Sequence, residues 1–191
     1  MGRFISGLII GIILVPLGVW AWFRWGNPPV AVADHPLPFE KQITSVPLHA
    51  RIDREMPKNA PIQPTADNLI AGAQIYSDNC AFCHGLQGKP SEFGAHMFPG
   101  APQLWRKHPH GDVVGVSDDP PGETFWKVAN GIRLTGMPAF DHTLSNEQMW
   151  QVTLLLANAN KPLPPEAKVM VSPPAANPPA PPAAAAPAKN R

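Results

Sequence analysis

The sequence predicts an all-α domain, because one central stretch has helical spacing of apolar residues and proline-rich segments flank it on both sides. The chain has 191 residues and 26 prolines. The prolines crowd into residues 28–64 and 162–187, and an uncharged apolar run lies near the N-terminus. We therefore expect four parts: a transmembrane anchor at 1–26, a Pro-rich linker at 27–64, a folded domain at 65–164 and a disordered Pro/Ala-rich tail at 165–191.

Within the central stretch, helix boundaries are marked by capping residues. Thr65 can cap a first helix that delivers Cys80 at its C-terminal end. Residues 122–130 predict a short helix stopped by Gly131. Ser145 and Gln148 have the spacing of a capping box at the start of a last helix.

The N-terminal run from Phe4 to Phe23 carries no charge over twenty residues, which is roughly 30 Å as a helix and enough to cross a bilayer core. Tryptophans follow where such a helix would leave the membrane, as in an interfacial aromatic belt: Trp20, Trp22 and Trp25. The run is longer than the apolar part of a removable signal peptide, although Ala31-Val32-Ala33 resembles a cleavage site. The spacing of Gly7 and Gly11 would admit a partner transmembrane helix.

Composition limits the remaining segments and the partner classes. Eight prolines in residues 27–64 predict a semi-extended tether with one short helical turn around residues 52–56. Residues 171–191 hold seven prolines and eight alanines and have almost nothing to bury. Fifteen Lys/Arg against 14 Asp/Glu leave a net charge of +1. No basic patch indicates nucleic-acid binding.

The chemistry-bearing motif is Cys80-Ala81-Phe82-Cys83-His84, which contains the only two cysteines of the chain. Such a motif suits a redox dithiol, half of a metal site or covalent haem attachment. A zinc site needs four ligands, and no second Cys pair or His-x-x-x-His supplies them. A thioredoxin-like dithiol needs a βαβ context that the sequence lacks. The motif therefore predicts c-type haem attachment, with His84 as the proximal iron ligand.

The second axial ligand of the iron has more than one candidate by residue type. Met97 lies in a Gly/Pro-rich loop 13 residues after His84, and His96 precedes it. Met137 lies between Gly136 and Pro138, where the glycine permits a tight backbone and the proline fixes the turn. The residues alone favour Met137, with Met97 as the principal rival.

Three stretches of the chain resemble class I cytochromes c, in particular monohaem, membrane-anchored bacterial members. The first is Gly72-x-x-x-Tyr76-x-x-x-Cys80-x-x-Cys83-His84, the opening helix and haem motif of that family. The second is Ala101-Pro102-Gln103-Leu104, similar to its proline-x-leucine stretch. The third, residues 130–140, is similar to its methionine-ligand loop, and the likeness extends over about residues 65–160.

The resemblance implies a cytochrome c fold, with three to four helices around one covalently bound haem c. It implies that Met137 is the iron ligand opposite His84. It also implies that the carbonyl of Pro102 holds the His84 ring and that Leu104 packs on it. Candidate partners for the haem propionates are Arg106, Lys107 and Arg133.

A haem iron with both axial positions filled predicts a one-electron carrier without catalytic residues. The resemblance implies a haem domain on the periplasmic side of a bacterial cytoplasmic membrane. Its expected partners are respiratory or photosynthetic: a quinol-oxidising complex, a terminal oxidase, a reaction centre or another cytochrome. The alternatives are an electron-relay subunit of a periplasmic dehydrogenase or quinol-oxidising complex, and a haem-based ligand sensor or peroxidase. We expect Met137→Ala to lower the potential and Met97→Ala to change little.

Overall fold

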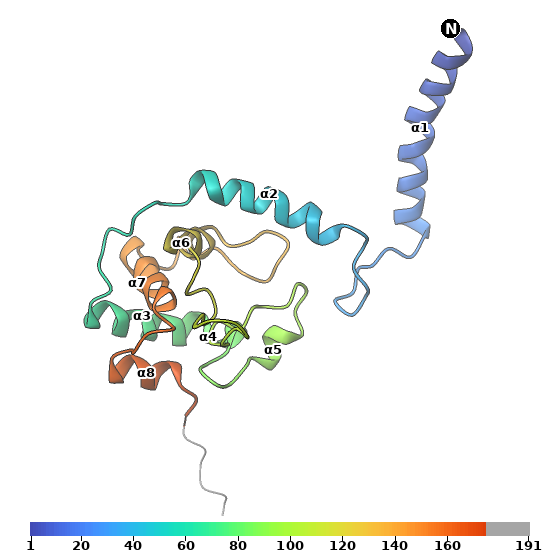
Figure 1. Ribbon diagram of the computed structural model, residues 1–191. Coiled ribbons are helices and arrows are strands. Elements are labelled where there is room, and N and C mark those ends of the chain that lie inside the picture. Colours follow the sequence, from blue (N-terminus) through green and yellow to red (C-terminus); the bar gives the residue numbers. More distant parts are fainter. Residues whose placement is uncertain (175–191) are drawn as a thin grey trace, which may run out of the picture. The chain divides into compact units, whose positions relative to one another are not determined.

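The computed structural model of the protein describes residues 1–174, and its regular elements there are all helices, which confirms the all-α prediction. Strand-like pairing in these residues is limited to two isolated bridges. The chain divides into two compact units, Met1–Ala50 and Arg51–Arg191. Figure 1 labels the helices: α1 (Gly2–Trp25), α2 (Glu40–Glu55), α3 (Ala66–Asn79), α4 (Ala81–His84), α5 (Glu92–Ala95), α6 (Pro121–Asn130), α7 (Asn146–Ala157) and α8 (Pro165–Val171).

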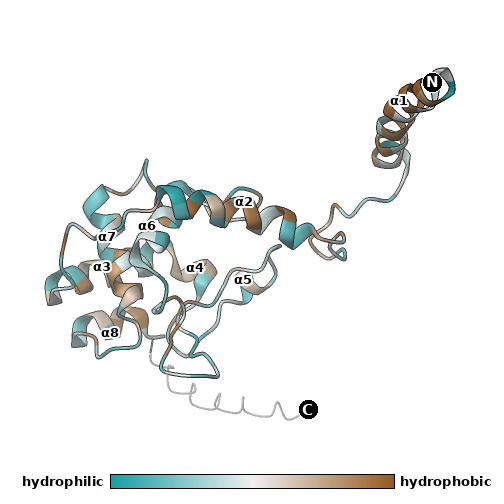
Figure 2. Cartoon of the chain, turned by 45° about the horizontal axis from the view of Figure 1, so that its top comes forward, coloured by the Kyte–Doolittle hydropathy of each residue, from teal (hydrophilic) through white to brown (hydrophobic). Residues whose placement is uncertain are grey.

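Helix α1 forms the N-terminal part of the first unit and is apolar along most of its length (Figure 2). Among the described residues it is the one helix long and apolar enough to cross a membrane. Near its end the rings of Trp20 and Trp25 meet edge to face, with 5.1 Å between their centroids. The guanidinium of Arg24 lies 5.9 Å from the Trp25 ring centroid. The end of α1 is therefore aromatic and cationic, which is compatible with an anchor.

Helix α2 is a difference from the sequence prediction. Residues 27–64 were expected to be a semi-extended tether, yet 16 of them form a helix with Pro47 in its interior. Ile52 is the single buried residue of α2. The helix therefore does not bury a continuous apolar face, which is the feature that sequence periodicity detects. The eight prolines of residues 27–64 give this segment the composition of a linker. Pro47 lies within α2 without ending it, so the proline content does not indicate the helix.

The last turn of α2 belongs to the second unit and is fixed to α6. Ile52 is 1% exposed. The indole Nε1 of Trp126 donates a 3.0 Å hydrogen bond to the Glu55 carboxylate. The same carboxylate accepts from Arg51 Nε at 2.9 and 3.1 Å, and the Arg51 guanidinium lies 5.8 Å from the Trp126 ring centroid. Arg51, Glu55 and Trp126 thus form one cluster beside a buried isoleucine.

The core of the second unit is built where α3 meets α7. Thr65 caps α3 by accepting from the backbone of Asn68, as predicted. A side chain at Gly72 would overlap the carbonyl oxygen of Gln151 in α7, so glycine permits the close approach of the two backbones. Tyr76 and Leu155 are fully buried at this contact.

Helices α6 and α7 pack on each other beside that contact (Figure 1). Gly131 ends α6 with φ of 65°, and Ser145 and Gln148 form the predicted capping box of α7. The rings of Phe125 and Trp150 stack with 4.3 Å between centroids. The predicted end of α6 and the predicted start of α7 are therefore confirmed.

Helix α8 contradicts part of the predicted disordered tail at 165–191. It packs against α3, with Ala167 and Val171 fully buried. Backbone N–H of Gln87 donates to the carbonyl of Val171 at 2.8 Å. Proline is compatible with this helix because Pro165 occupies its first position, where the backbone N–H would have no partner within the helix. The rest of the predicted tail, from residue 175, lies outside the described residues.

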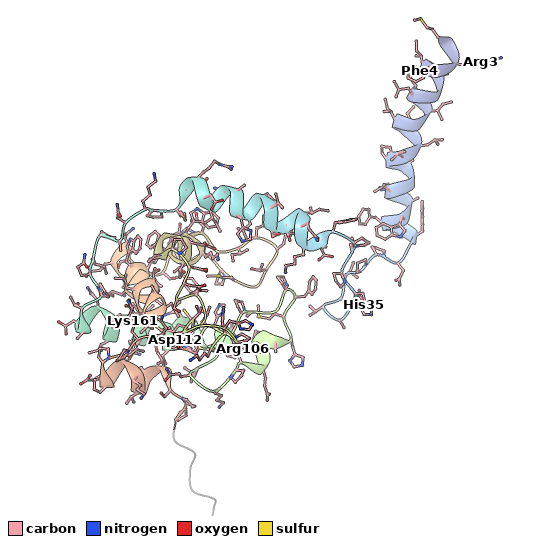
Figure 3. All side chains as sticks on the ribbon, in the orientation of Figure 1. Arg3, Phe4, His35, Arg106, Asp112 and Lys161 are labelled. Atoms are coloured by element: carbon pink, nitrogen blue, oxygen red, sulfur yellow. The ribbon has the colours of Figure 1, made fainter. Side chains whose placement is uncertain are left out.

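The domain has more helices than the three to four expected. Helices α4 and α5 have four residues each, and α8 lies beyond the predicted end of the domain. The stretch between α4 and α6 contains α5 and several turns. Figure 3 places Arg106 and Asp112 in this stretch.

Truncating Ile52 should destabilise the second unit. We expect Ile52→Ala to lower the free energy of unfolding by about 2–5 kcal/mol, the usual range for emptying a buried isoleucine site. The measurement is denaturant unfolding of the full chain in mild detergent. Ile43→Ala, the same change on a residue of α2 that is 69% exposed, should change little. Equal effects would show that α2 is not docked through Ile52.

The Glu55 cluster should make stability depend on pH. Hydrogen bonds from Arg51, and then from Trp126, hold the pKa of Glu55 below its ordinary value of 4.5. The stabilisation is therefore present above pH 4.5 and lost as pH falls through the lower folded-state pKa. Glu55→Gln should flatten this part of the stability profile. Glu147→Gln is the control, because Glu147 joins none of the ion pairs of residues 1–174.

Candidate functional site

One turn of helix brings both thiols and the imidazole of the motif together. Cys80 ends α3 and begins α4. Its carbonyl accepts from the backbone N–H of Cys83 at 3.1 Å and of His84 at 2.9 Å. Gly85 then ends the turn with φ of 74°, a conformation that favours glycine. The turn therefore fixes the relative positions of two sulfurs and one imidazole.

Tyr76 holds both ends of this turn. Its carbonyl accepts from the backbone N–H of Cys80 at 2.9 Å, and its hydroxyl donates to the Gly85 carbonyl at 2.7 Å. Burial raises the pKa of Tyr76 far above its ordinary value, so the hydroxyl keeps its proton for this bond. Tyr76, four residues before Cys80 as in class I cytochromes c, thus fixes the two ends of the turn by hydrogen bonds.

The two cysteines are free and partly buried. Burial, with a smaller contribution from the Cys83 charge, raises the pKa of Cys80 to about 12. Redox-active and nucleophilic cysteines have lowered pKa values, because the thiolate is the reactive form. The environment of Cys80 therefore disfavours thiolate chemistry and fits a thiol destined for covalent attachment.

The His84 imidazole is fixed by the loop that follows α5. Its Nδ1 lies 2.8 Å from the carbonyl oxygen of Pro102. A carbonyl can only accept, so Nδ1 carries the proton and the lone pair of Nε2 remains for a metal. Burial lowers the pKa of His84, against the opposing effect of the Pro102 hydrogen bond. The ring is thus neutral, which is the form that binds metals.

The backbone beside His84 is tied to the same loop. The N–H of Leu104 donates to the His84 carbonyl at 3.4 Å, and Leu104 is buried. The Gln103 side chain accepts from the Ser91 N–H at 2.6 Å and donates to the Ala101 carbonyl at 3.1 Å. Sequence reasoning missed Gln103, because its role depends on contacts twelve residues away along the chain.

Met137 lies in a compact turn that begins at Gly131. Its carbonyl accepts from the Ile132 N–H at 3.2 Å, and its N–H donates to the Thr135 hydroxyl at 3.1 Å. Gly131 has φ of 65°, and a side chain there would meet the backbone from Met137 to Ala139. Met137 is partly buried against the core, and the methyl group of Met97 touches Gly136, the residue before it.

Three basic residues expected near a cofactor are solvent-exposed: Arg106, Lys107 and Arg133. Lys107 pairs with Asp112 at 3.2 Å. A residue that the sequence did not single out is Trp105, which is 6% exposed. Its indole lies against Tyr76, with 5.6 Å between the ring centroids, and its N–H makes no hydrogen bond of good geometry among residues 1–174, so a bound group could supply a better acceptor.

The donor set fits haem c better than a bare metal ion. No group of three or more His, Cys, Asp or Glu side chains that could hold a metal ion occurs in the described part of the chain. What is present is two thiols for two vinyl groups, a neutral imidazole with Nε2 available, and a thioether. Trp105 adds a buried donor, for which a haem propionate is a suitable acceptor.

Comparisons with known proteins point to the same cofactor. Residues 67–154 match a family model described as "Cytochrome C oxidase, cbb3-type, subunit III". No curated protein matches the chain significantly.

One solved structure is similar, a reducing HAO-like protein complex of Kuenenia stuttgartiensis, at 18% identity and a TM-score of 0.40. The match covers 73% of this chain and 54% of the other, so this chain spans about half the length of its structural neighbour.

The family match covers the whole motif from α3 to α7, including Cys80, Cys83 and His84. The cysteines fit the Cys-x-x-Cys-His pattern by which haem c is attached through two thioether bonds. The pattern occurs once in the sequence. The chain is therefore a c-type cytochrome, with one covalently attached haem c in an all-α domain.

Proposed function

We propose that this protein is a membrane-anchored one-electron carrier with haem iron ligated by His84 and Met137. The observation that carries the proposal is the His84 imidazole, which shares one turn with both thiols and has Nδ1 held 2.8 Å from the Pro102 carbonyl. The turn directs one imidazole nitrogen away from the protein backbone for ligation. When bound, haem c supplies an iron that gains and loses one electron.

The residues around the iron hold its ligands in place during electron transfer. Pro102 keeps the His84 ring in one tautomer and orientation, which also makes Nε2 a stronger donor. Leu104, whose backbone N–H donates to the His84 carbonyl, is buried and would shield the ring from water. The thioether of Met137, a soft and weakly basic ligand, favours the reduced iron and raises the potential. With both axial positions filled, no position remains for a substrate.

The location and partners follow from α1 and from the family. Helix α1 would hold the protein in the bacterial cytoplasmic membrane as a single span, with the haem domain on the periplasmic side. The partners would be redox proteins such as a quinol-oxidising complex, a terminal oxidase or a reaction centre. A Cβ atom added at Gly7 or Gly11 would have no other atom of the described residues within 4 Å. These two positions of α1 would therefore let a partner transmembrane helix approach closely.

A second candidate is a fixed subunit of a larger redox enzyme. The observation in its favour is the family description, which names a subunit of an oxidase. In that case the chain would relay electrons and the catalytic centre would lie on another chain. Purification in mild detergent from the native membrane separates the two: a catalytic chain in stoichiometric amount supports the subunit, and a monomer reduced rapidly by soluble donors supports the carrier.

Replacing Met137 should change the iron site. We expect Met137→Leu to lower the midpoint potential by about 100 mV, well within the ~0.8 V range that axial ligands span. The variant should also bind carbon monoxide in the reduced state, whereas the unaltered protein should not. The measurements are potentiometric titration and the visible spectrum.

Met170→Leu is the matched control, because Met170 is also a partly buried methionine packed against the core. It should leave potential and spectrum unchanged. A Met137→Leu protein that keeps the long-wavelength thioether charge-transfer band would refute Met137 as the ligand. Carbon monoxide binding by the unaltered protein would instead support the sensor or peroxidase alternative.

A further inference from the structure

Met97 packs against the glycine that precedes Met137. A side chain built at Gly136 would overlap the terminal methyl group of Met97, and its Cβ would lie 3.6 Å from the Met97 sulfur. Within residues 1–174, apart from the chain neighbours of Gly136, no other residue comes within 4 Å of that position. The end of the Met97 side chain therefore occupies the space that a side chain at position 136 would need.

The turn that carries Met137 is otherwise held mainly by its own backbone and hydroxyl groups. Thr135 donates its N–H and its hydroxyl to the Ile132 carbonyl, at 3.2 and 2.6 Å. Leu134, at the tip of the turn, is 75% exposed. A turn closed on itself can move as one piece, so a contact from outside, such as that of Met97, has a large influence on where Met137 lies.

Met97 is itself held by the haem-attachment motif. Gly94 in α5 packs directly on the carbonyl oxygen of Cys83, where a side chain would not fit. The Gly94 carbonyl accepts from Ala101 at 2.9 Å and from the backbone of Met97 at 3.4 Å. Ser91 caps α5 by accepting from Gly94 at 2.9 Å. A continuous path of contacts therefore runs from Cys83 through Gly94 and Met97 to Gly136.

We propose that Met97 is a positioning residue that holds the Met137 thioether on the iron by packing into the space at Gly136. The proposal rests on the proposed role of Met137 as axial ligand. A flexible, polarisable thioether is well suited to fill this irregular gap. When the contact is present, the turn that carries Met137 stays closed, and the Met137–iron bond breaks less often. This revises the expectation that Met97→Ala has little effect.

Imidazole competition measures how firmly Met137 is held. Imidazole binds the ferric iron only while Met137 is dissociated, so its apparent affinity rises in proportion to the dissociated fraction. We expect Met97→Ala in the full-length holoprotein to bind imidazole about tenfold more tightly, which corresponds to a 1.4 kcal/mol weaker hold on Met137. Met97→Leu, which restores the volume without the sulfur, should return the affinity close to that of the unaltered protein.

A double-mutant cycle tests the contact itself. Gly136→Ala places a methyl group where the end of Met97 lies, so it should displace Met97 and also tighten imidazole binding. In Met97→Ala/Gly136→Ala the new methyl group occupies the emptied space. The double variant should therefore bind imidazole no more tightly than either single variant. Additive effects would show that the two residues act independently and would overturn the proposal.

The Met137→Leu background separates this proposal from the ligand assignment. With the sixth position open, Met97→Ala should leave imidazole binding unchanged. If Met137→Leu binds imidazole no better than the unaltered protein, the Met137 ligand assignment fails. If that assignment holds but Met97→Ala has no effect in the unaltered background, the positioning role alone fails. Loss of the thioether band in Met97→Leu, with its retention in Met137→Leu, would make Met97 the ligand and refute both.

Discussion

The hydrogen bond between His84 and Pro102 is the constraint on which the site depends. A carbonyl 2.8 Å from Nδ1 fixes the tautomer, the ring orientation and the basicity of the nitrogen that faces away from it. For Pro102 to reach His84, the chain after the motif must return to α4. The two residues after Pro102 add hydrogen bonds between this return and the motif: the Gln103 amide donates to the Cys83 carbonyl, and the Leu104 N–H donates to the His84 carbonyl. The chain between α4 and Pro102 therefore forms a loop that returns to the His84 imidazole.

The two residues proposed as axial ligands, His84 and Met137, are held by different kinds of interaction. On the side of His84, Tyr76, Pro102 and Leu104 make directional hydrogen bonds to the motif, and two covalent bonds to the cofactor add to them. On the side of Met137, a turn bonded within itself meets Met97 through van der Waals contact alone. Directional bonds tolerate little displacement, whereas packing contacts yield gradually. Variation in this protein should therefore affect methionine ligation before it affects histidine ligation.

The sequence was most informative where a residue type has one structural use. Thr65, Gly131 and Ser145 were identified as helix caps, and the structure has those boundaries. The Cys80–His84 motif determined the cofactor, because its spacing suits two vinyl groups and an iron ligand. In each case a local pattern carried the information, and no distant contact was needed to interpret it.

The sequence was least informative where distant residues decide the structure. The proline content predicts extended chain in both flanking segments, although Pro165 begins α8 and Pro47 lies within α2. Gln103, Trp105 and the contact between Met97 and Gly136 had no local pattern to mark them. Their roles depend on partners that the fold brings from other parts of the chain.

The helical form of α2 limits the length of the segment before the haem domain. Sixteen residues span about 24 Å as a helix but about 50 Å when extended. These 16 residues are therefore shorter as α2 than as the extended chain that their proline content predicts. Because Ile52 and the Glu55–Trp126 bond hold the last turn of α2 on the domain, this turn cannot lengthen without losing buried contacts.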